Sequence, residues 1–590
     1  MNTYYTNEHA ILIILSLLKK HGIRKVVVSP GATNITLVAS MQQDPFFEIY
    51  SSVDERSAGY IATGLASESG EPVVLSCTGA TASRNYMPAL TEAYYRKLPI
   101  LAITATQGDE RSYHNIPQVI DRTTVPNDIA KLSVSIRACK DEKDEWEATI
   151  KANKAILELT RNGGGPVHIN LATTYSRDYS VKELPDVRAI KRITTSDKYP
   201  EILSSKKIAI FIGSHKDFSE EETNAIDSFC ATYNAVALCD HTSGYKGKYA
   251  VHHALVLSQQ YYKSVLSQID LLIHLGEISG DYCTTDKLKP KEVWRVSPDG
   301  ELRDTFKTLQ YIFQMQEIEF FQNYKKEEQI SKNTLLNECN TEYEYVYNSL
   351  PDVDFSNIWI AKNCISQIPE NSVVHFGILN SLRSWNFFKL PESVKSYCNV
   401  GGFGIDGAIS TIIGGALAKP DKLHFAILGD LAFFYDMNAL GNRHLLKNIR
   451  ILLINNGKGT EFRNYNHPGA VFGEKADDYI AAGGHYACQS KTLVKNYAEA
   501  LGFKYLSASD KPELIEASKI FFTEQVSDKP MLLEVFTESK KESDALFSTR
   551  NAITDNKTFI ELRQTGASIA KSVLPKDSYN KIKNIAKKFL

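Results

Sequence analysis

The stretch from His424 to Phe462 constrains the fold of this chain more than any other part of it. It opens with the apolar run HFAILG and, after a segment long enough for a helix, continues with the apolar run ILLINN. Runs of this kind suit fully buried parallel strands, and the segment between them makes a right-handed crossover the default connection. Asp430 and Asn456 stand at the ends of the two runs. We therefore expect them side by side at the carboxyl edge of a parallel sheet, where such sheets bind ligands.

A carboxylate and an amide oxygen at neighbouring strand ends are ligands that Mg²⁺ accepts. Together with a backbone carbonyl from Gly457 or Lys458 they would form an oxygen set that leaves coordination positions for diphosphate. The sequence thus predicts a site for Mg²⁺ and diphosphate, with Asp430, Asn456 and Lys458 as its metal residues. The alternative is that Asp430 caps a helix and the two asparagines form a turn.

Composition places the chain among ordinary globular proteins with several domains. Its 590 residues are too many for one core, and a net charge of −2 does not indicate nucleic acid or an acidic membrane surface as a partner. The nine cysteines include no C-x-x-C pair, which indicates neither a zinc site nor a disulfide framework and favours a reducing cytoplasm. The early apolar run ILIILSLL is too short to span a bilayer, so we expect it to be the buried face of a first helix.

Short β-rich runs alternate with helical segments along most of the chain. Before about Tyr179 the runs are KVVVSP, FEIYSS, PVVLSCTG, PILAITA and GPVHINL; between 206 and 313 they are IAIFIG, AVALC, LLIHLG and VWRVSP. This alternation is typical of doubly wound α/β sheets. The segment 178–198, with Pro185 and alternating charges, is interpreted as a linker, and 325–348 as a charged helical connector.

Several motifs resemble those of thiamine diphosphate enzymes of the acetolactate synthase and 2-oxo acid decarboxylase type. Gly429-Asp430 and Asn455-Asn456 are similar to the family's diphosphate and metal motif. SSVDERSAGYIATGLA resembles the segment around the family's glutamate, which places Glu55 at that position. Within the family, GDLAFFYDMNAL, with GGFGIDGAIST before it, most resembles the menaquinone-pathway synthases that join 2-oxoglutarate to isochorismate.

The resemblance implies three doubly wound parallel-sheet domains: a pyrimidine-binding domain over 1–180, a middle domain over 195–345 and a diphosphate- and Mg²⁺-binding domain over 355–549. A helical C-terminal extension over 550–590 follows, with a basic amphipathic end that we expect to pack on the protein itself rather than touch a membrane. Some relatives bind a flavin or a nucleotide in the middle domain. Because this chain shows no G-x-G-x-x-G fingerprint there, we expect that domain to be structural.

The resemblance also implies roles for individual residues. Glu55 is expected to share a proton with N1′ of the aminopyrimidine ring of thiamine diphosphate; from the residues alone it could equally be a first-turn glutamate stabilised by the helix dipole. Gln118 and His114 are the other expected catalytic residues, and His114 could equally be a solvated loop histidine. Phe403 or Ile405 would support the cofactor from below, the alternative being a phenylalanine in the core. The expected cofactor-binding residues are Pro30, Gly31, Thr78, Gly79, Asn85, Asn380, Ser381, Phe403, Gly404, Ile405, Gly429, Asp430, Leu431, Asn456 and Phe462.

For function, the resemblance implies Mg²⁺-dependent decarboxylation of a 2-oxo acid and transfer of the resulting acyl carbanion to a carbonyl acceptor. It also implies a homodimer with shared active sites, which could assemble further into a tetramer. Thr33, Thr106-Gln107 and Val400 stand where the menaquinone-pathway synthases carry arginines for substrate carboxylates. Ala32, Thr33 and Arg383 are the expected substrate residues, with Arg383 as the nearby substitute cation.

From these departures we expect a carboligase similar to acetolactate synthase, with a small donor such as pyruvate and an acceptor other than isochorismate. Two alternatives remain open: a decarboxylase that releases an aldehyde, and a catalytically inactive scaffold.

Overall fold

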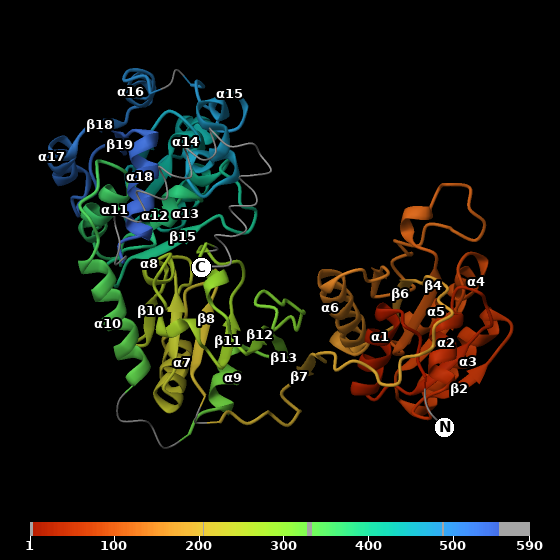
Figure 1. The fold of residues 1–590 in the computed structure, drawn as a ribbon. Helices are drawn as coiled ribbons and strands as arrows, with labels where there is room; N and C mark the ends of the chain where they lie inside the picture. Colours follow the sequence, from red (N-terminus) through yellow and green to blue (C-terminus); the bar gives the residue numbers. More distant parts are fainter. Residues whose placement is uncertain (1–3, 204–205, 282, 327–332, 487–488, 554–590) are drawn as a thin grey trace, which may run out of the picture. The chain divides into compact units, whose positions relative to one another are not determined.

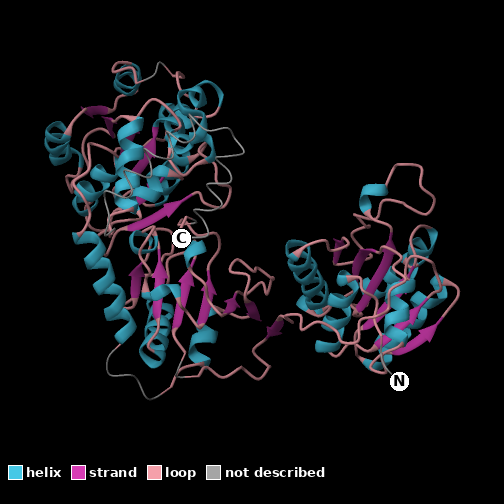
Figure 2. Ribbon diagram, viewed as in Figure 1, coloured by secondary structure: helices cyan, strands magenta, loops and turns pink. Residues whose placement is uncertain are grey.

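The computed structural model describes residues 4–203, 206–281, 283–326, 333–486 and 489–553. The chain divides into two compact units: one combines residues 1–201 with 292–320, and the other combines 202–291 with the chain from 321 onward. Three parallel sheets, each accompanied by helices, make up the fold (Figures 1 and 2). The predicted α/β class is therefore confirmed. Apart from its first residues, the predicted C-terminal extension lies outside the described part of the chain.

The first unit contains a six-stranded parallel sheet in the order β2-β1-β3-β4-β6-β5. Its strands are β1 (Lys25–Val28), β2 (Glu48–Ser51), β3 (Val73–Cys77), β4 (Ile100–Thr106), β5 (Leu132–Ile136) and β6 (Val167–Ala172). Its helices are α1 (His9–Lys20), α2 (Ile35–Gln42), α3 (Glu55–Ser69), α4 (Thr81–Asn85), α5 (Met87–Tyr95) and α6 (Glu142–Glu158). As predicted, the run ILIILSLL is the buried part of a first helix, and α1 packs with α6 in one hydrophobic core.

The second unit contains the sheet that the opening sequence motif predicts. Its order is β15-β14-β16-β17-β19-β18, with all strands parallel. The strands are β14 (Val373–Phe376), β15 (Lys395–Cys398), β16 (His424–Gly429), β17 (Ile449–Asn455), β18 (Lys504–Ala508) and β19 (Met531–Phe536). The helices are α11 (Asn357–Cys364), α12 (Asn380–Trp385), α13 (Ala408–Ala418), α14 (Asp430–Asp436), α15 (Ala476–Tyr479), α16 (Leu493–Ala500), α17 (Lys511–Phe521) and α18 (Ser539–Arg550). Strands β16 and β17 are neighbours, which brings the Asp430 and Asn456 turns to the same sheet edge.

The third sheet has seven strands in the order β10-β9-β8-β11-β12-β13-β7. They are β7 (Lys191–Ile193), β8 (Ile208–Ile212), β9 (Val236–Cys239), β10 (Ala250–His252), β11 (Leu271–Leu275), β12 (Glu292–Val296) and β13 (Leu309–Phe313). The accompanying helices are α7 (Glu220–Tyr233), α8 (Ala254–Leu257), α9 (Glu317–Asn323) and α10 (Thr334–Asn348). Strand β7 lies inside the segment that we interpreted as a linker, so that segment also contributes an edge strand.

The turns after β8 and β11 meet at the point where a doubly wound sheet would bind a nucleotide. Here the two turns approach closely: a Cβ atom on Gly213 would lie 2.0 Å from the Glu277 carbonyl oxygen. The Glu277 amide donates to the Ser214 carbonyl over 2.8 Å. A structural role for the middle domain stays a prediction. Among the described residues, no helix has the length and apolar character needed to cross a membrane.

Candidate cofactor and active site

A cavity of about 460 Å³ opens at the carboxyl edge of the sheet in the second unit. Its walls come from the segments that follow β14, β15, β16 and β17. It is lined by Ile378, Leu379, Asn380, Ser381, Phe403, Gly404, Ile405, Asp406, Gly429, Asp430, Leu431, Ala432, Tyr435, Asn456, Lys458, Gly459, Thr460, Glu461 and Phe462. Every residue that we predicted for the cofactor or metal between 355 and 549 belongs to this lining.

Asp430 begins helix α14 directly after β16, and only 4% of it is exposed. Its carboxylate accepts hydrogen bonds from the backbone amides of Leu431, over 2.8 Å, and Gly457, over 2.6 Å. Burial raises the pKa of Asp430 to about 6, and these backbone donors oppose the rise. A bound cation would offset the cost of keeping this carboxylate ionised, so the position suits a metal.

The two adjacent asparagines have different contacts. The Asn456 side-chain oxygen accepts from the Thr460 hydroxyl over 2.8 Å and from the Lys458 amide over 3.3 Å, within the cavity lining. Asn455 instead directs its amide nitrogen to Glu534 on β19, over 2.7 Å. Asn456 is therefore the candidate ligand, whereas Asn455 supports the turn from within the sheet.

Lys458 could contribute to a metal site only through its backbone carbonyl. Its ammonium group pairs with Asp477 over 2.5 Å, which commits the charge to another carboxylate. Within the described residues, no group of three or more His, Cys, Asp or Glu side chains could hold a metal. The predicted site does not require such a cluster. It consists of one carboxylate, one amide oxygen and one backbone carbonyl, with diphosphate oxygens as further ligands, and this set fits Mg²⁺ and thiamine diphosphate.

The cavity also offers apolar side chains for the rings of a cofactor. Ile405 packs against the hydrophobic core formed by α13, α14, β16 and β17, which fixes its position. Phe403 has a positive φ of 54° and is 43% exposed. Of the two residues predicted to support the cofactor from below, Ile405 is thus the one held by the core.

Arg383, on α12, lies beside the cavity with its charge already paired. It makes two hydrogen bonds to the Glu461 carboxylate, over 2.6 and 3.0 Å, and donates to the Asn380 side-chain oxygen over 2.9 Å. Only 9% of Arg383 is exposed. The Glu461 partner could not be predicted, because the two residues lie on separate segments that only the fold brings together. Substrate binding by Arg383 stays a prediction.

In the first unit, Glu55 lies at the start of α3 and is partly buried. Asp54 caps the helix by accepting from the Ser57 amide over 2.9 Å, and the Asn85 amide nitrogen lies 3.5 Å from the Glu55 carboxylate. The structure therefore brings together Glu55 and Asn85, one predicted for catalysis and one for the cofactor.

The other predicted residues of the first unit lie on the turns after β1 and β3 and on a long loop. A Cβ atom on Gly31 would come within 2.5 Å of the Thr78 Cβ, so the turns with Pro30, Gly31 and Thr78 are in close contact. Thr33 is buried: its hydroxyl bonds to Thr78 and donates to the Ala105 carbonyl over 3.0 Å. Three other predicted residues are exposed: Ala32, His114 and Gln118.

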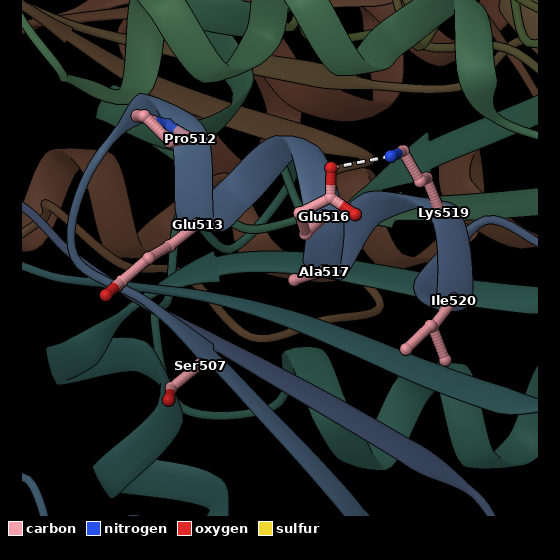
Figure 3. Close-up of a pocket in the computed structure, with 7 residues that line it drawn as sticks. All are labelled: Ser507, Pro512, Glu513, Glu516, Ala517, Lys519 and Ile520. Carbon is pink, nitrogen blue, oxygen red and sulfur yellow. Dashed lines mark hydrogen bonds and ion pairs between the residues drawn. The ribbon is translucent and has the colours of Figure 1, made fainter.

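A second hollow, of about 710 Å³, lies beside β18 and α17 (Figure 3). It is lined by Ser507, Pro512, Glu513, Glu516, Ala517, Lys519 and Ile520. Glu516 and Lys519 form an ion pair there over 2.6 Å. It contains none of the predicted site residues, and its lining includes two carboxylates, Glu513 and Glu516, and one ammonium group, Lys519.

A buried aspartate and an amide at neighbouring strand ends, with a separate sheet unit that carries a glutamate at a helix start, define a thiamine diphosphate enzyme. Residues 10–125 match the family described as "Thiamine pyrophosphate enzyme, N-terminal TPP binding domain", and residues 380–535 match "Thiamine pyrophosphate enzyme, C-terminal TPP binding domain". The chain belongs to the thiamine pyrophosphate enzyme family. The predicted resemblance is confirmed, and thiamine diphosphate with a divalent metal are the cofactors of this family.

Individual relatives resemble the chain over nearly its whole length. A protein of Bacteroides fragilis is 32% identical over 562 residues, covering 92% of this chain and 98% of the relative. A protein of Bacteroides thetaiotaomicron is 32% identical with the same two coverages, and one of Flavobacterium johnsoniae is 28% identical, covering 89% and 95%. All three are named 2-succinyl-5-enolpyruvyl-6-hydroxy-3-cyclohexene-1-carboxylate synthase.

These relatives overturn one prediction. We expected a carboligase similar to acetolactate synthase that does not use isochorismate, and this is wrong, because the 32% identical relatives carry the name of the menaquinone-pathway synthase. That prediction rested on single positions: because Thr33 stands where an arginine was expected, we inferred that a substrate-binding cation is lost. The structure shows why that comparison is weak: the guanidinium of Arg122, from a different segment, donates to the same Ala105 carbonyl as Thr33.

Proposed function

We propose that the chain is a thiamine diphosphate- and Mg²⁺-dependent synthase that forms 2-succinyl-5-enolpyruvyl-6-hydroxy-3-cyclohexene-1-carboxylate from 2-oxoglutarate and isochorismate. The observation that carries the proposal is the cavity around Asp430 and Asn456, in a chain that covers 98% of the length of a synthase of this name. The proposed reaction is a carboligation, in which decarboxylation of the 2-oxo acid precedes attachment of its remaining succinyl group to the acceptor.

The metal would be held by the Asp430 carboxylate, the Asn456 side-chain oxygen and the Lys458 carbonyl. Asn380, Ser381 and Ile405 line the same cavity and are proposed to contact the cofactor. When bound, thiamine diphosphate supplies the electron sink that decarboxylation needs. The walls of the cavity would orient it and exclude water from the reacting carbon.

Glu55 is proposed to hold a proton against the N1′ atom of the cofactor. That role needs a carboxyl group shielded from water, because a shielded carboxyl shares its proton more readily with a weak base. In the single chain Glu55 is only partly buried. A second copy of the chain, covering Glu55, would supply the missing burial.

Exposed apolar side chains support such a homodimer. Near Glu55, Val53 is 82% exposed and Tyr60 is 49% exposed. On the cavity-bearing unit, Tyr435 is 58% exposed and Phe472 is 56% exposed. Large exposed apolar side chains that cluster around a site mark surfaces that bind another protein. We propose that Glu55 of one subunit serves the cofactor held by its partner. Assembly into a tetramer stays a prediction. A cytoplasmic location also stays a prediction, and it is supported by the eight described cysteines, which are free thiols.

The test is product formation by the purified protein with thiamine diphosphate, Mg²⁺, 2-oxoglutarate and isochorismate, followed by mass spectrometry and by release of CO₂. We expect one CO₂ per product molecule and no product when either substrate is left out. An Asp430→Ala variant is the control for a contaminating enzyme. Wild-type protein that binds the cofactor but yields no product would contradict the proposal.

A further inference from the structure

Arg122 is a buried cation with two guanidinium nitrogens that lack a hydrogen-bond partner among the described residues. Only 3% of the residue is exposed, and its single hydrogen bond runs from Nη2 to the Ala105 carbonyl, over 3.3 Å. Its Nε and Nη1 atoms have no hydrogen-bond partner among the residues that the structure describes. Burial lowers the pKa of Arg122. Because burying an unpaired charge is costly, a position like this needs a compensating ligand.

The acidic side chains around Arg122 are already engaged elsewhere. The neighbouring Asp121 accepts from the Tyr113 hydroxyl over 2.8 Å and from the Thr123 hydroxyl over 2.6 Å. Asp109 accepts from the Asn170 amide nitrogen over 2.6 Å. The nearby Arg84 adds positive charge rather than removing it. Among the described residues, neither carboxylate hydrogen-bonds to Arg122, so the guanidinium keeps unused donors for an incoming anion.

The guanidinium lies where predicted site residues converge. A Cβ atom on Gly79 would be 3.4 Å from Arg122 Nη1 and 3.2 Å from the carbonyl oxygens of both Ala105 and Gln118. The Ala105 carbonyl also accepts from Thr33, the position at which the resemblance to the menaquinone-pathway synthases implies an arginine. The Arg122 guanidinium and the Thr33 hydroxyl therefore donate to the same carbonyl oxygen, and Arg122 lies in the segment between β4 and β5.

We propose that Arg122 is a substrate-binding residue that receives a carboxylate group of the substrate and takes over the role of the arginine missing at Thr33. This inference rests on the proposed function for the identity of the acid. Charge-assisted hydrogen bonds between guanidinium and carboxylate are the strong form of this contact. The carboxylate could belong to the linear 2-oxo acid or to the cyclic acceptor.

Because only 3% of Arg122 is exposed, a ligand can reach it only if neighbouring chain moves, and the loop that precedes it in the sequence is the candidate. That loop, residues 107–121, contains three non-glycine residues in the left-handed region: Tyr113 at φ 67°, Asn115 at 59° and Gln118 at 65°. Side chains rarely adopt this conformation without a compensating contact. We expect the loop to rearrange when the acid binds, so that Gln118 and Arg122 face the same ligand.

The first experiment measures binding without turnover, on protein loaded with thiamine diphosphate and Mg²⁺. The probes in calorimetry are glutarate for the linear acid, cyclohex-1-ene-1-carboxylate for the cyclic acid, and the uncharged amide of each. We expect wild type to bind at least one acid at least tenfold more tightly than its amide. Arg122→Met should lose that preference, and Arg122→Lys should keep part of it. The acid that binds more weakly to Arg122→Met identifies the substrate whose carboxylate Arg122 binds. The matched control is Arg137→Met, an exposed arginine of the same unit, which should bind as wild type does.

The second experiment separates a binding role from a structural one by the sign of a stability change. Removing a buried charge with unused hydrogen-bond donors should raise the melting temperature of the ligand-free protein in Arg122→Met. A lower melting temperature, or a chain that fails to fold, would make Arg122 structural and overturn the proposal. So would unchanged acid binding by Arg122→Met, or wild type that prefers neither acid over its amide. Because neither readout uses turnover, Arg122-dependent acid binding would stand even if no synthase product were found.

Discussion

The side-chain amide of Asn455 donates to the buried carboxylate of Glu534 on the adjacent strand β19, over 2.7 Å. The Tyr505 hydroxyl donates to the same carboxylate over 2.8 Å. Because Asn455 immediately precedes the candidate metal ligand Asn456, this contact anchors the end of β17 from which the metal turn departs. The pairing of these two side chains connects the core of the sheet to the cofactor site.

We expect Glu534→Ala to weaken both the fold and cofactor binding. The change leaves the Asn455 amide and the Tyr505 hydroxyl without their acceptor in a buried place, which should cost ~2–4 kcal/mol of unfolding free energy. The affinity for thiamine diphosphate should fall with it. The control is Glu516→Ala, which removes an exposed ion pair with Lys519 (Figure 3) and should stay within ~0.5 kcal/mol of wild type. Equal effects from the two variants in urea unfolding would contradict this account.

Glu542 should make a contribution to the stability of the cofactor-free protein that falls as pH rises from about 5 to 8. Burial raises the pKa of Glu542 to about 7. The folded chain then keeps a proton that the unfolded chain loses near its ordinary pKa, so the stabilising contribution is full at low pH and is lost as pH passes 7. Its size is at most ~3 kcal/mol. Chemical unfolding at pH 5 and pH 8 should show that Glu542→Gln removes this contribution, so that the change in unfolding free energy between the two pH values differs from that of wild type. An equal change in both proteins would refute the role of Glu542.

Gly31→Ala should disturb the turn that we propose for the pyrimidine side of the cofactor. Its new methyl group would lie 2.5 Å from the Thr78 Cβ, closer than carbon atoms can approach, so one turn must shift. We expect a loss of ~1–3 kcal/mol in stability together with weaker cofactor binding. Gly64→Ala, within α3 and with no atom within 4 Å of the added Cβ, is the matched control and should not lower the melting temperature. Comparable melting curves for the two variants would argue against close packing of Gly31 on Thr78.

Mixing two inactive variants tests whether active sites are shared between subunits. Glu55→Gln and Asp430→Ala each disable one part of the proposed site. If each site combines Glu55 of one subunit with Asp430 of the other, a mixed dimer retains one intact site. Random exchange of subunits should then restore about a quarter of wild-type activity. No recovery after verified subunit exchange would show that each chain uses its own Glu55.

Much of the fold could be predicted from the sequence because its central strands are long apolar runs. HFAILG and ILLINN became β16 and β17, and Glu55 begins α3 as expected. Two edge strands escaped notice: β5 reads LSVSI, in which serine alternates with apolar residues, and β7 is only KRI. The predicted domain boundaries stay predictions.

Several side-chain contacts of the candidate site could not be predicted from the sequence. Motifs located the cavity lining and singled out Asn456 as the metal residue, but they could not reveal that Asn455 bonds to Glu534, because that contact depends on the pairing of β17 with β19. They could not reveal that Glu461 pairs with Arg383 either, since the two residues are 78 positions apart. The buried Arg122 had no motif of its own. Its position beside Thr33 depends on a shared carbonyl that only tertiary structure provides.

The most direct test of the account is the turnover of Glu55→Gln protein loaded with thiamine diphosphate and Mg²⁺, with cofactor affinity measured on the same sample. Since Gln cannot hold the proton at N1′, we predict a fall in kcat of at least ~100-fold while the cofactor Kd changes only a few-fold. Turnover equal to wild type would contradict the claim that Glu55 activates the cofactor bound at Asp430.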